Sequence, residues 1–321
     1  MKSTLIKIVV SLGFLALLHL PASAAETAAH SAKLPHEIRI GYQKYGTLFL
    51  LKLRGNLEKR LEPLGVSVKW SEFPFGPPML EALNADKLDY ASTGETPPVF
   101  AQAAKGSKLV YVGHEHPSPR SEAILVPENS AITSPGELKG KKVAFAKGSN
   151  AHFLLISALA RAGLSFADIQ PVSLPPADAR AAFERGAVDA WAVWDFYRAA
   201  AEFQLHAKTL SDGQGLVENY EIYTSRRDFA EQYPELLKIV AEEADKEDAH
   251  IHDDPAAAAD ILSRQIGVAQ EILLTSIKRR DYGASPVTPA LLANQQKIAD
   301  TLLSIGLIPQ ALRVEDAVLK H

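Results

Sequence analysis

Residues 82–90 read Ala-Leu-Asn-Ala-Asp-Lys-Leu-Asp-Tyr, and residues 182–190 read Ala-Phe-Glu-Arg-Gly-Ala-Val-Asp-Ala. Each stretch predicts a helix that runs through a turn and an Asp into a short strand. A short segment follows each strand: Gly94-Glu95-Thr96 in the first copy and Trp194-Asp195-Phe196 in the second. Because ligands of open α/β sheets bind at the carboxyl ends of strands, two such lobes would place these segments across a cleft from each other.

Strand-like and helix-like runs alternate on both sides of these two similar stretches, which we call the sequence echo. Strands are expected at 38–42, 66–70, 88–92, 109–113, 123–126, 142–145, 172–174 and 189–193, with helices at 48–61, 78–84, 97–104, 150–162 and 177–185. This order is typical of largely parallel sheets with helices on both faces. After residue 220 the chain is expected to be strongly helical, from 229 onward and over 255–266, 269–278 and 289–305.

The first 24 residues have the features of a secretory signal peptide. Lys2 and Lys7 precede an apolar run over 8–20, and Ala22-Ser23-Ala24 matches a cleavage site. An uncleaved membrane anchor is the alternative, although the apolar run is short for a bilayer. Cleavage would leave 297 residues with 32 basic and 38 acidic side chains, a net charge of −6.

Composition excludes several function classes. The 321 residues include no cysteine, which rules out disulfides, thiolate nucleophiles and zinc–thiolate sites. Mild acidity without basic runs argues against nucleic acid as a partner. The common hydrolase, nucleotide-binding and dinucleotide-binding motifs are missing, so neither a catalytic residue nor a cofactor is predicted.

Three predicted helix starts could hold an anion. They are Gly46-Thr47, Gly94-Glu95-Thr96-Pro97-Pro98 and Lys147-Gly148-Ser149-Asn150. A helix N-terminus has unpaired N–H groups and about half a positive charge, and a capping hydroxyl adds a donor. Ser149 is the favoured anion-binding position. At each of the three helix starts, the alternative is an ordinary N-cap that binds no ligand. Several such positions meeting in one cleft would capture a small anion without a buried lysine.

Other side chains could complete such a site. Gln43 and Tyr45 can donate neutral hydrogen bonds, and Phe75 and Trp194 could cover an alkyl tail or belong to the core. Glu95 is unexpected beside an anion and should either point away or order neighbouring donors. His114 suggests a hinge or cleft role, or a metal site with His116, and Asp178 and Asp195 could be paired carboxylates.

Taken together, these motifs resemble the aliphatic sulfonate-binding proteins. The resemblance rests on residues 41–47, 94–98, 147–150, 174–183, 188–191 and 194–195, and it continues through residue 300. Members of that family are periplasmic subunits of ABC importers, related to taurine- and nitrate-binding proteins. Sulfinate desulfinases share the fold but use a cysteine nucleophile, which this chain lacks.

The resemblance implies an α/β, two-lobed periplasmic-binding-protein fold of type II, in which each lobe is a mainly parallel sheet flanked by helices. The implied organisation is a signal peptide over 1–24, the first part of lobe 1 over 36–118, lobe 2 over 119–220, and a return to lobe 1 with C-terminal helices over 221–321. The ligand is expected in the cleft.

The resemblance also implies that the chain captures alkanesulfonates in the periplasm and delivers them to an inner-membrane ABC permease for sulfur acquisition. It would act as a monomer, without nucleic acid, metal or cofactor. Taurine binders usually carry a Ser-rich version of 94–98, so simple alkanesulfonates are favoured over taurine. The alternatives are a binder of taurine or another oxyanion, an organosulfur hydrolase or lyase, and a metal scavenger. The predicted ligand-binding set is Gln43, Tyr45, Thr47, Phe75, Gly94, Glu95, Thr96, His114, Gly148, Ser149, Asn150, Asp178, Trp194 and Asp195.

Overall fold

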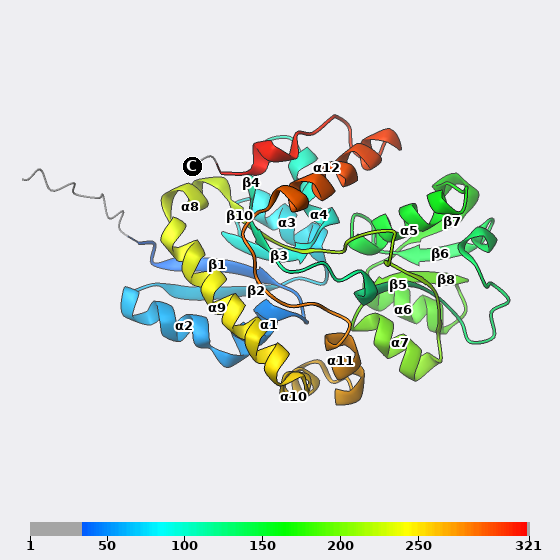
Figure 1. Cartoon of the computed structure of the whole chain (residues 1–321), viewed down its shortest axis with the longest axis horizontal. Coiled ribbons are helices and arrows are strands. Elements are labelled where there is room, and N and C mark those ends of the chain that lie inside the picture. The colour runs from blue at the N-terminus through cyan, green and yellow to red at the C-terminus, as the bar shows by residue number, and fades with distance from the viewer. Residues whose placement is uncertain (1–33, 320–321) are drawn as a thin grey trace, which may run out of the picture. The chain divides into compact units, whose positions relative to one another are not determined.

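A computed structural model describes residues 34–319, so the predicted signal peptide lies outside the described residues. Two five-stranded sheets organise this part of the chain (Figure 1). None of its helices has the length and apolar character needed to cross a membrane. We call each sheet, with the helices packed on it, a lobe.

The sheet of the first lobe has the order β2-β1-β3-β10-β4. Its strands are β1 (Glu37–Tyr42), β2 (Ser67–Glu72), β3 (Tyr90–Gly94), β4 (Leu109–His114) and β10 (Glu221–Arg226). The sheet of the second lobe has the order β7-β6-β8-β5-β9. Its strands are β5 (Glu122–Val126), β6 (Lys142–Phe145), β7 (Gln170–Ser173), β8 (Ala190–Trp194) and β9 (Lys208–Asp212).

The two sheets share one topology. In each, the first three strands in the order pair in parallel, while the fourth strand, β10 or β5, pairs antiparallel with both neighbours. Four of five strands therefore run in the same direction, which confirms the mainly parallel two-lobed α/β fold. The chain crosses between the lobes over 115–121 and again over 213–220. We propose the lobe boundaries at residues 118 and 220, within these crossings.

Helices cover both faces of each sheet (Figure 1). The α-helices are α1 (Thr47–Arg54), α2 (Asn56–Leu61), α3 (Gly76–Asn84), α4 (Thr96–Ala103), α5 (Asn150–Arg161), α6 (Pro176–Glu184), α7 (Tyr197–Leu205), α8 (Arg227–Gln232), α9 (Pro234–Asp253), α10 (Pro255–Ile266), α11 (Gln270–Ile277) and α12 (Pro289–Ser304). Short 3-10 turns lie at Glu62–Leu64, Pro119–Ser121, Pro135–Leu138, Phe166–Asp168 and Val314–Ala317.

The sequence echo has a structural counterpart. Asp89 lies just before β3 and accepts the backbone N–H of Arg39 at 2.9 Å, whereas Asp189 lies just before β8 and accepts that of Lys142 at 2.7 Å. In both lobes a carboxylate thus pairs with the N–H of the neighbouring parallel strand, where the ladder begins. The repeated Asp therefore fixes the start of equivalent strands.

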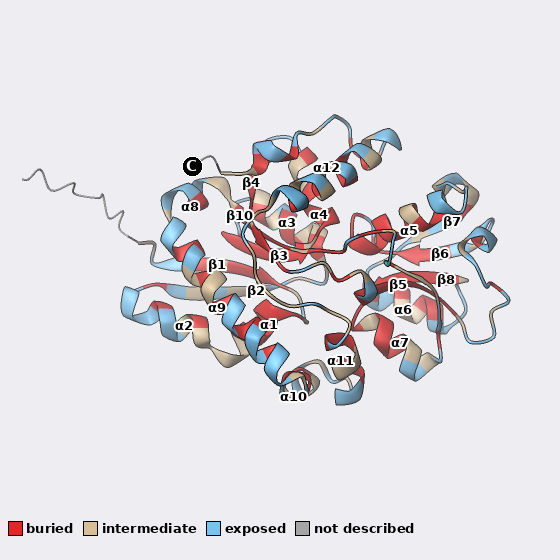
Figure 2. Cartoon of the chain, in the orientation of Figure 1, coloured by how far each residue is buried: buried red, intermediate tan, exposed pale blue. Residues whose placement is uncertain are grey.

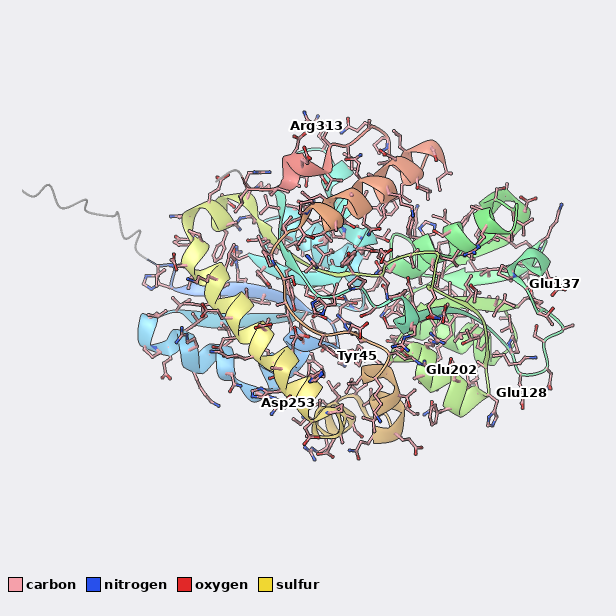
Figure 3. All side chains as sticks on the ribbon, viewed as in Figure 1. Tyr45, Glu128, Glu137, Glu202, Asp253 and Arg313 are labelled. Atoms are coloured by element: carbon pink, nitrogen blue, oxygen red, sulfur yellow. The ribbon has the colours of Figure 1, made fainter. Side chains whose placement is uncertain are left out.

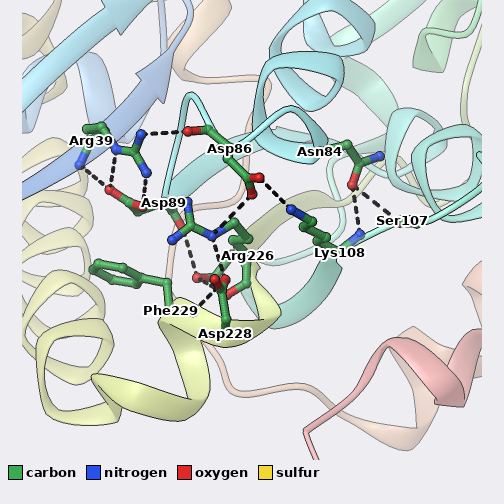
Figure 4. Close-up of polar contacts among 10 residues, drawn as sticks. Arg39, Asn84, Asp86, Asp89, Ser107, Lys108, Arg226, Asp228 and Phe229 are labelled. Carbon is green, nitrogen blue, oxygen red and sulfur yellow. Dashed lines mark hydrogen bonds and ion pairs between the residues drawn. The ribbon is translucent and has the colours of Figure 1, made fainter.

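Strand β10 is tied to the first sheet by ionic contacts as well as by its ladder (Figure 4). Arg226, its last residue, lies 3.3 Å from Asp89, which also pairs with Arg39 at 2.6 Å. Asp86 pairs with Lys108 and lies 3.6 Å from Arg226. These contacts join β1, β3 and β10 at the edge of the sheet where β1 and β3 begin.

The expectation of a helical chain after residue 220 is wrong at its start, because residues 221–226 form β10 in the middle of the first sheet. Strand β9 and helix α7 were not predicted. The helix expected over 48–61 is two helices, separated at Gly55, which has a φ of +65°. A left-handed residue ends a helix, so the chain turns there.

Buried residues lie on the strands and on the helix faces that pack against them (Figure 2). One buried cluster lies under α1, α2 and α9 in the first lobe, and another lies on one face of the second sheet. A third cluster joins α3, α4 and α12 of the first lobe to α5 of the second. The lobes therefore share apolar packing on one side of the region between them.

Candidate functional site

The strand ends, the two crossings and two helix N-termini line a cavity of about 60 Å³ between the lobes. Its walls come from both lobes, as the sequence echo predicted for segments 94–96 and 194–196. The lining residues are Gln43, Tyr45, Gly76, Thr93, Gly94, Pro97, Ser118, Ser121, Ser149, Asn150, Trp194, Asp195, Asn219, Glu221 and Arg280.

The N-terminus of α5 forms one end of the cavity. Ser149 is its N-cap: the side-chain oxygen accepts the backbone N–H of His152 at 3.3 Å, and the hydroxyl donates to the carbonyl of Ala146 at 2.7 Å. The hydroxyl proton is therefore engaged within the loop. The backbone N–H groups of Asn150 and Ala151 lie in the first turn of α5, where no preceding helical carbonyl can accept them. No other partner for them is found among residues 34–319. Of these two residues, Asn150 lines the cavity, so its N–H is the donor that α5 offers to an anion there.

Gly148 shapes the approach to this helix. Its φ is +78°, which favours glycine, and a Cβ at this position would lie 3.2 Å from Pro77 of the first lobe. Gly148 itself does not line the cavity. It sets the direction of the loop that presents Ser149 and Asn150.

The N-terminus of α4 is already occupied. The backbone N–H of Thr96 donates to the Oδ1 atom of Asn150 at 2.9 Å, and Thr96 is fully buried without lining the cavity. The sequence suggested that the hydroxyls of Thr96 and Ser149 grip one anion together. In the structure the side chain of Asn150, from the second lobe, accepts the N–H that α4 would offer an anion. Of the two helices, only α5 therefore has an N-terminus open to a ligand.

A largely buried arginine lines the cavity, although the sequence suggested a site of neutral donors. Arg280 follows α11, and its side chain is 12 % exposed. It contacts Glu115 at 2.8 Å and Glu221 at 3.2 Å. Burial alone would lower the pKa of Arg280, but these carboxylates hold it well above its ordinary value. Two carboxylates thus offset the desolvation that argued against a buried cation.

Glu95 orders the second crossing. Its carboxylate accepts the backbone N–H groups of Asn219 at 3.0 Å and Tyr220 at 3.1 Å, and the side-chain amide of Asn294 at 2.8 Å. Burial raises the pKa of Glu95 to about 7, against the lowering effect of these hydrogen bonds. Of the two roles predicted for Glu95, its contacts match the ordering of neighbours.

Tyr45, Trp194 and Asp195 line the cavity, Tyr45 from the first lobe and the other two from the second. Figure 3 labels Tyr45 in the first lobe and Glu202 of α7 in the second. Asp195 accepts the backbone N–H of Ala199 at 3.0 Å and contacts Arg279 at 3.3 Å. Burial raises its pKa to about 6, although Arg279 acts in the opposite direction.

Of the predicted site residues, the structure brings Gln43, Tyr45, Gly94, Ser149, Asn150, Trp194 and Asp195 to the cavity wall. Thr47 lies beside an adjoining hollow of about 50 Å³ and donates to Asp248. Phe75 is half-buried at the start of α3, and Asp178 is exposed on α6. Neither lines the cavity.

His114 is buried at the end of β4. Its Nδ1 lies 2.8 Å from the carbonyl of Glu115, and its ring packs against Tyr220. His116 is exposed. Within residues 34–319, no group of three or more His, Cys, Asp or Glu side chains is placed to hold a metal ion.

Sequence reasoning missed the residues that the crossings and the C-terminal helices contribute. Asn219 donates to the carbonyl of Ser118 and to the hydroxyl of Ser121, both at 2.9 Å. Neither these residues nor Arg280 stands in a recognisable motif. Their meeting depends on how the chain returns from the second lobe.

His152 makes the α5 loop sensitive to acid. Its Nδ1 accepts the N–H of Gly148 at 3.2 Å, so the ring is neutral, and burial lowers its pKa from 6.5 to about 4. A lowered folded-state pKa gives stability that is present above pH 6.5 and is lost as pH falls toward 4. Compared with His152→Gln, the wild type should lose about 2 kcal/mol between pH 7.5 and pH 5.

Chemical denaturation of both proteins at the two pH values checks this expectation. His252→Gln, at a side chain that is 85 % exposed, is the matched control and should show no such difference. An equal pH response of wild type and His152→Gln would contradict a neutral, buried His152.

Comparisons with known proteins agree with this geometry. The profile of the family described as NMT1/THI5 like matches residues 65–258. A protein of Escherichia coli named putative aliphatic sulfonates-binding protein is 42 % identical over 93 % of each chain.

Two solved structures are also similar. The alkanesulfonate-binding protein SsuA from Xanthomonas axonopodis pv. citri, bound to MOPS, has a TM-score of 0.84 and 37 % identity over 89 % of this chain and 99 % of its own. The periplasmic aliphatic sulphonate binding protein SsuA from Escherichia coli has a TM-score of 0.81 and 41 % identity over 89 % and 93 %. The chain therefore belongs to the NMT1/THI5-like family and, within it, to the aliphatic sulfonate-binding proteins.

Proposed function

We propose that this chain is a solute-binding protein that captures short alkanesulfonates between its lobes for an ABC importer. The observation that carries the proposal is the cavity between the lobes, which combines the free α5 N-terminus with the cation of Arg280. Relatives that match nearly the whole chain are named as aliphatic sulfonate-binding proteins. MOPS, which the Xanthomonas protein holds, is itself a sulfonate.

The charge of the cavity suits a monoanion better than a dianion. A sulfonate keeps one negative charge at physiological pH and needs donors, which the N–H group of Asn150 and the guanidinium of Arg280 supply. Asp195 and Glu221 also line the cavity. A second charge on sulfate or phosphate would face these carboxylates, so discrimination comes from repulsion.

The size of the cavity bounds the part of a ligand that it can hold. About 60 Å³ holds on the order of five water molecules. Trp194 and Tyr45 provide aromatic surface beside it. A sulfonate with few carbon atoms would fill this space, whereas a long chain would have to extend past the aromatic wall.

Calorimetric titration tests the proposed ligand class. Ethanesulfonate is expected to bind with a Kd near 1 μM or tighter, which corresponds to a binding free energy of about −8 kcal/mol. Octanesulfonate measures how long a tail the site accepts, and sulfate and phosphate should bind more weakly because of their second charge. A parallel titration with taurine shows whether the site distinguishes simple from amino-substituted sulfonates. Binding of carboxylates or nitrate with no response to any sulfonate would contradict the proposal.

The cellular setting is part of the same proposal. An exported chain would act in the periplasm as a monomer, and its ligand-bound form would dock on an inner-membrane permease that supplies the cell with sulfur. No nucleic acid, metal or cofactor takes part. Fractionation of cells, with the N-terminus of the recovered protein sequenced, tests the cleavage expected after Ala24.

A further inference from the structure

The side chain of Asn150 connects the two lobes. It belongs to the first residue of α5 in the second lobe, and its Oδ1 accepts the backbone N–H of Thr96, the first residue of α4 in the first lobe, at 2.9 Å. Asn150 is 9 % exposed and Thr96 is fully buried. This hydrogen bond therefore links the N-termini of two helices that belong to different lobes.

The amide group of Asn150 is also tied to both crossings. Its Nδ2 donates to Oδ1 of Asn219 in the second crossing. Asn219 in turn donates to the carbonyl of Ser118 in the first crossing and to Oγ of Ser121 at its end, both at 2.9 Å. The contact between the lobes is thus continuous with the segments about which the lobes would move.

Gly94 provides the space that Asn150 occupies. A Cβ at position 94 would lie 2.3–2.5 Å from the three terminal atoms of the Asn150 side chain. Gly94 does not have a positive φ, so its backbone conformation does not require glycine. The close approach of Asn150 is what excludes a side chain there.

Apolar contacts on the same side support this apposition. Phe100 of α4 stacks on His152 of α5, with ring centroids 6.5 Å apart. Gly148 also approaches Pro77 of the first lobe, since a Cβ at position 148 would lie 3.2 Å from it. The Asn150 hydrogen bond is therefore made inside an interface between the lobes, where water does not compete with it.

We infer that Asn150 locks the lobes together over the bound ligand by capping α4 of the other lobe, and that position 94 is glycine to admit it. The inference rests on the proposed function, because it assigns the lock to closure over that ligand. Asn150 then acts as a positioning residue: its side-chain amide holds the first lobe while its backbone N–H faces the anion. Opening the cleft must break the Asn150–Thr96 hydrogen bond, so the lock acts on ligand release.

A double-mutant cycle on Gly94 and Asn150 tests the lock. Gly94→Ala and Asn150→Ala should each raise the Kd for ethanesulfonate about tenfold, mainly through faster dissociation. In the Asn150→Ala background, Gly94→Ala should change the Kd less than twofold, because the atoms that it meets are gone. Gly136→Ala is the matched control, since the nearest atom to its Cβ is Oγ of Ser134 at 3.9 Å, and it should leave the Kd unchanged.

Two results would overturn the inference. An equal loss from Gly94→Ala with and without Asn150 would mean that the new methyl group acts on the ligand or the strand. Tighter binding by Asn150→Ala would mean that Asn150 competes with the anion for the α4 N-terminus instead of locking the lobes.

The distance between the lobes gives a readout that does not depend on the choice of ligand. The chain has no cysteine, so cysteines placed at exposed Lys105 and Glu184 would be the labelling points for energy transfer. Gly94→Ala should increase the distance between the dyes without ligand, and removal of the Asn150 side chain should reverse the increase. An unchanged distance in Gly94→Ala would contradict the lock. Failure of wild-type protein to bind any sulfonate would contradict the proposed function instead.

Discussion

Replacing Arg280 by methionine is expected to lower the free energy of unfolding by about 3–5 kcal/mol, because breaking a buried ion pair leaves an uncompensated charge. Glu115 is 1 % exposed, and both it and Glu221 would lose their cation. Guanidinium denaturation at pH 7.5 measures the loss. Arg264→Met removes a pair whose arginine is 64 % exposed and should change stability by less than about 0.5 kcal/mol.

The same variant tests the cation of the site. Hydrogen bonds to charged groups contribute about 1.5–3 kcal/mol, so affinity for ethanesulfonate should fall roughly 10- to 150-fold. Glu115→Gln in the Arg280→Met background should restore part of the stability, because one orphaned charge is removed, but none of the affinity. Unchanged affinity in a folded Arg280→Met protein would mean that the arginine only neutralises its two carboxylates.

Replacing Ser149 by alanine is expected to lower the free energy of unfolding by about 1 kcal/mol. Ligand binding should weaken by a similar amount, about 1 kcal/mol, through the loop and not through a lost contact, because the Ser149 hydroxyl donates to the carbonyl of Ala146. The side chain caps α5 and lines the cavity. Its loss would loosen the loop that presents the N–H group of Asn150. Calorimetry and chemical denaturation measure the two effects separately.

Ser134→Ala is the matched control for Ser149. Ser134 caps a short helix in the second lobe through a capping box, and it does not line the cavity. Its replacement should lower stability by a similar amount, because a cap is lost, and should leave the affinity for the ligand unchanged. If Ser149→Ala behaves in the same way, Ser149 is an ordinary N-cap, which is the alternative that the sequence left open.

The local features of this fold follow from short stretches of sequence. The repeated Asp before a short strand predicted equivalent positions in two lobes, and Asp89 and Asp189 make equivalent backbone contacts. The helix starting at Asn150 after Gly148-Ser149 was also predicted, because a cap and its glycine act within one turn of chain. Such contacts span few residues and leave a recognisable pattern.

The errors concern contacts between distant segments. Residues 221–226 were expected to begin a helical region, yet they form β10 between β3 and β4. A central strand is stabilised by the ladders on both sides, so its neighbours override local preference. Arg280 gave no signal either, since nothing near it in sequence shows that Glu115 and Glu221 lie beside it.

The sequence by itself determined the α/β class, the two lobes and one open helix N-terminus, because periodicity, capping and the repeated Asp act over short separations. Tertiary structure alone decided that Asn150 occupies the α4 N-terminus and that Arg280 is the cation of the cavity. The partners of these side chains lie more than fifty residues away, and they meet only when the chain has crossed between the lobes twice.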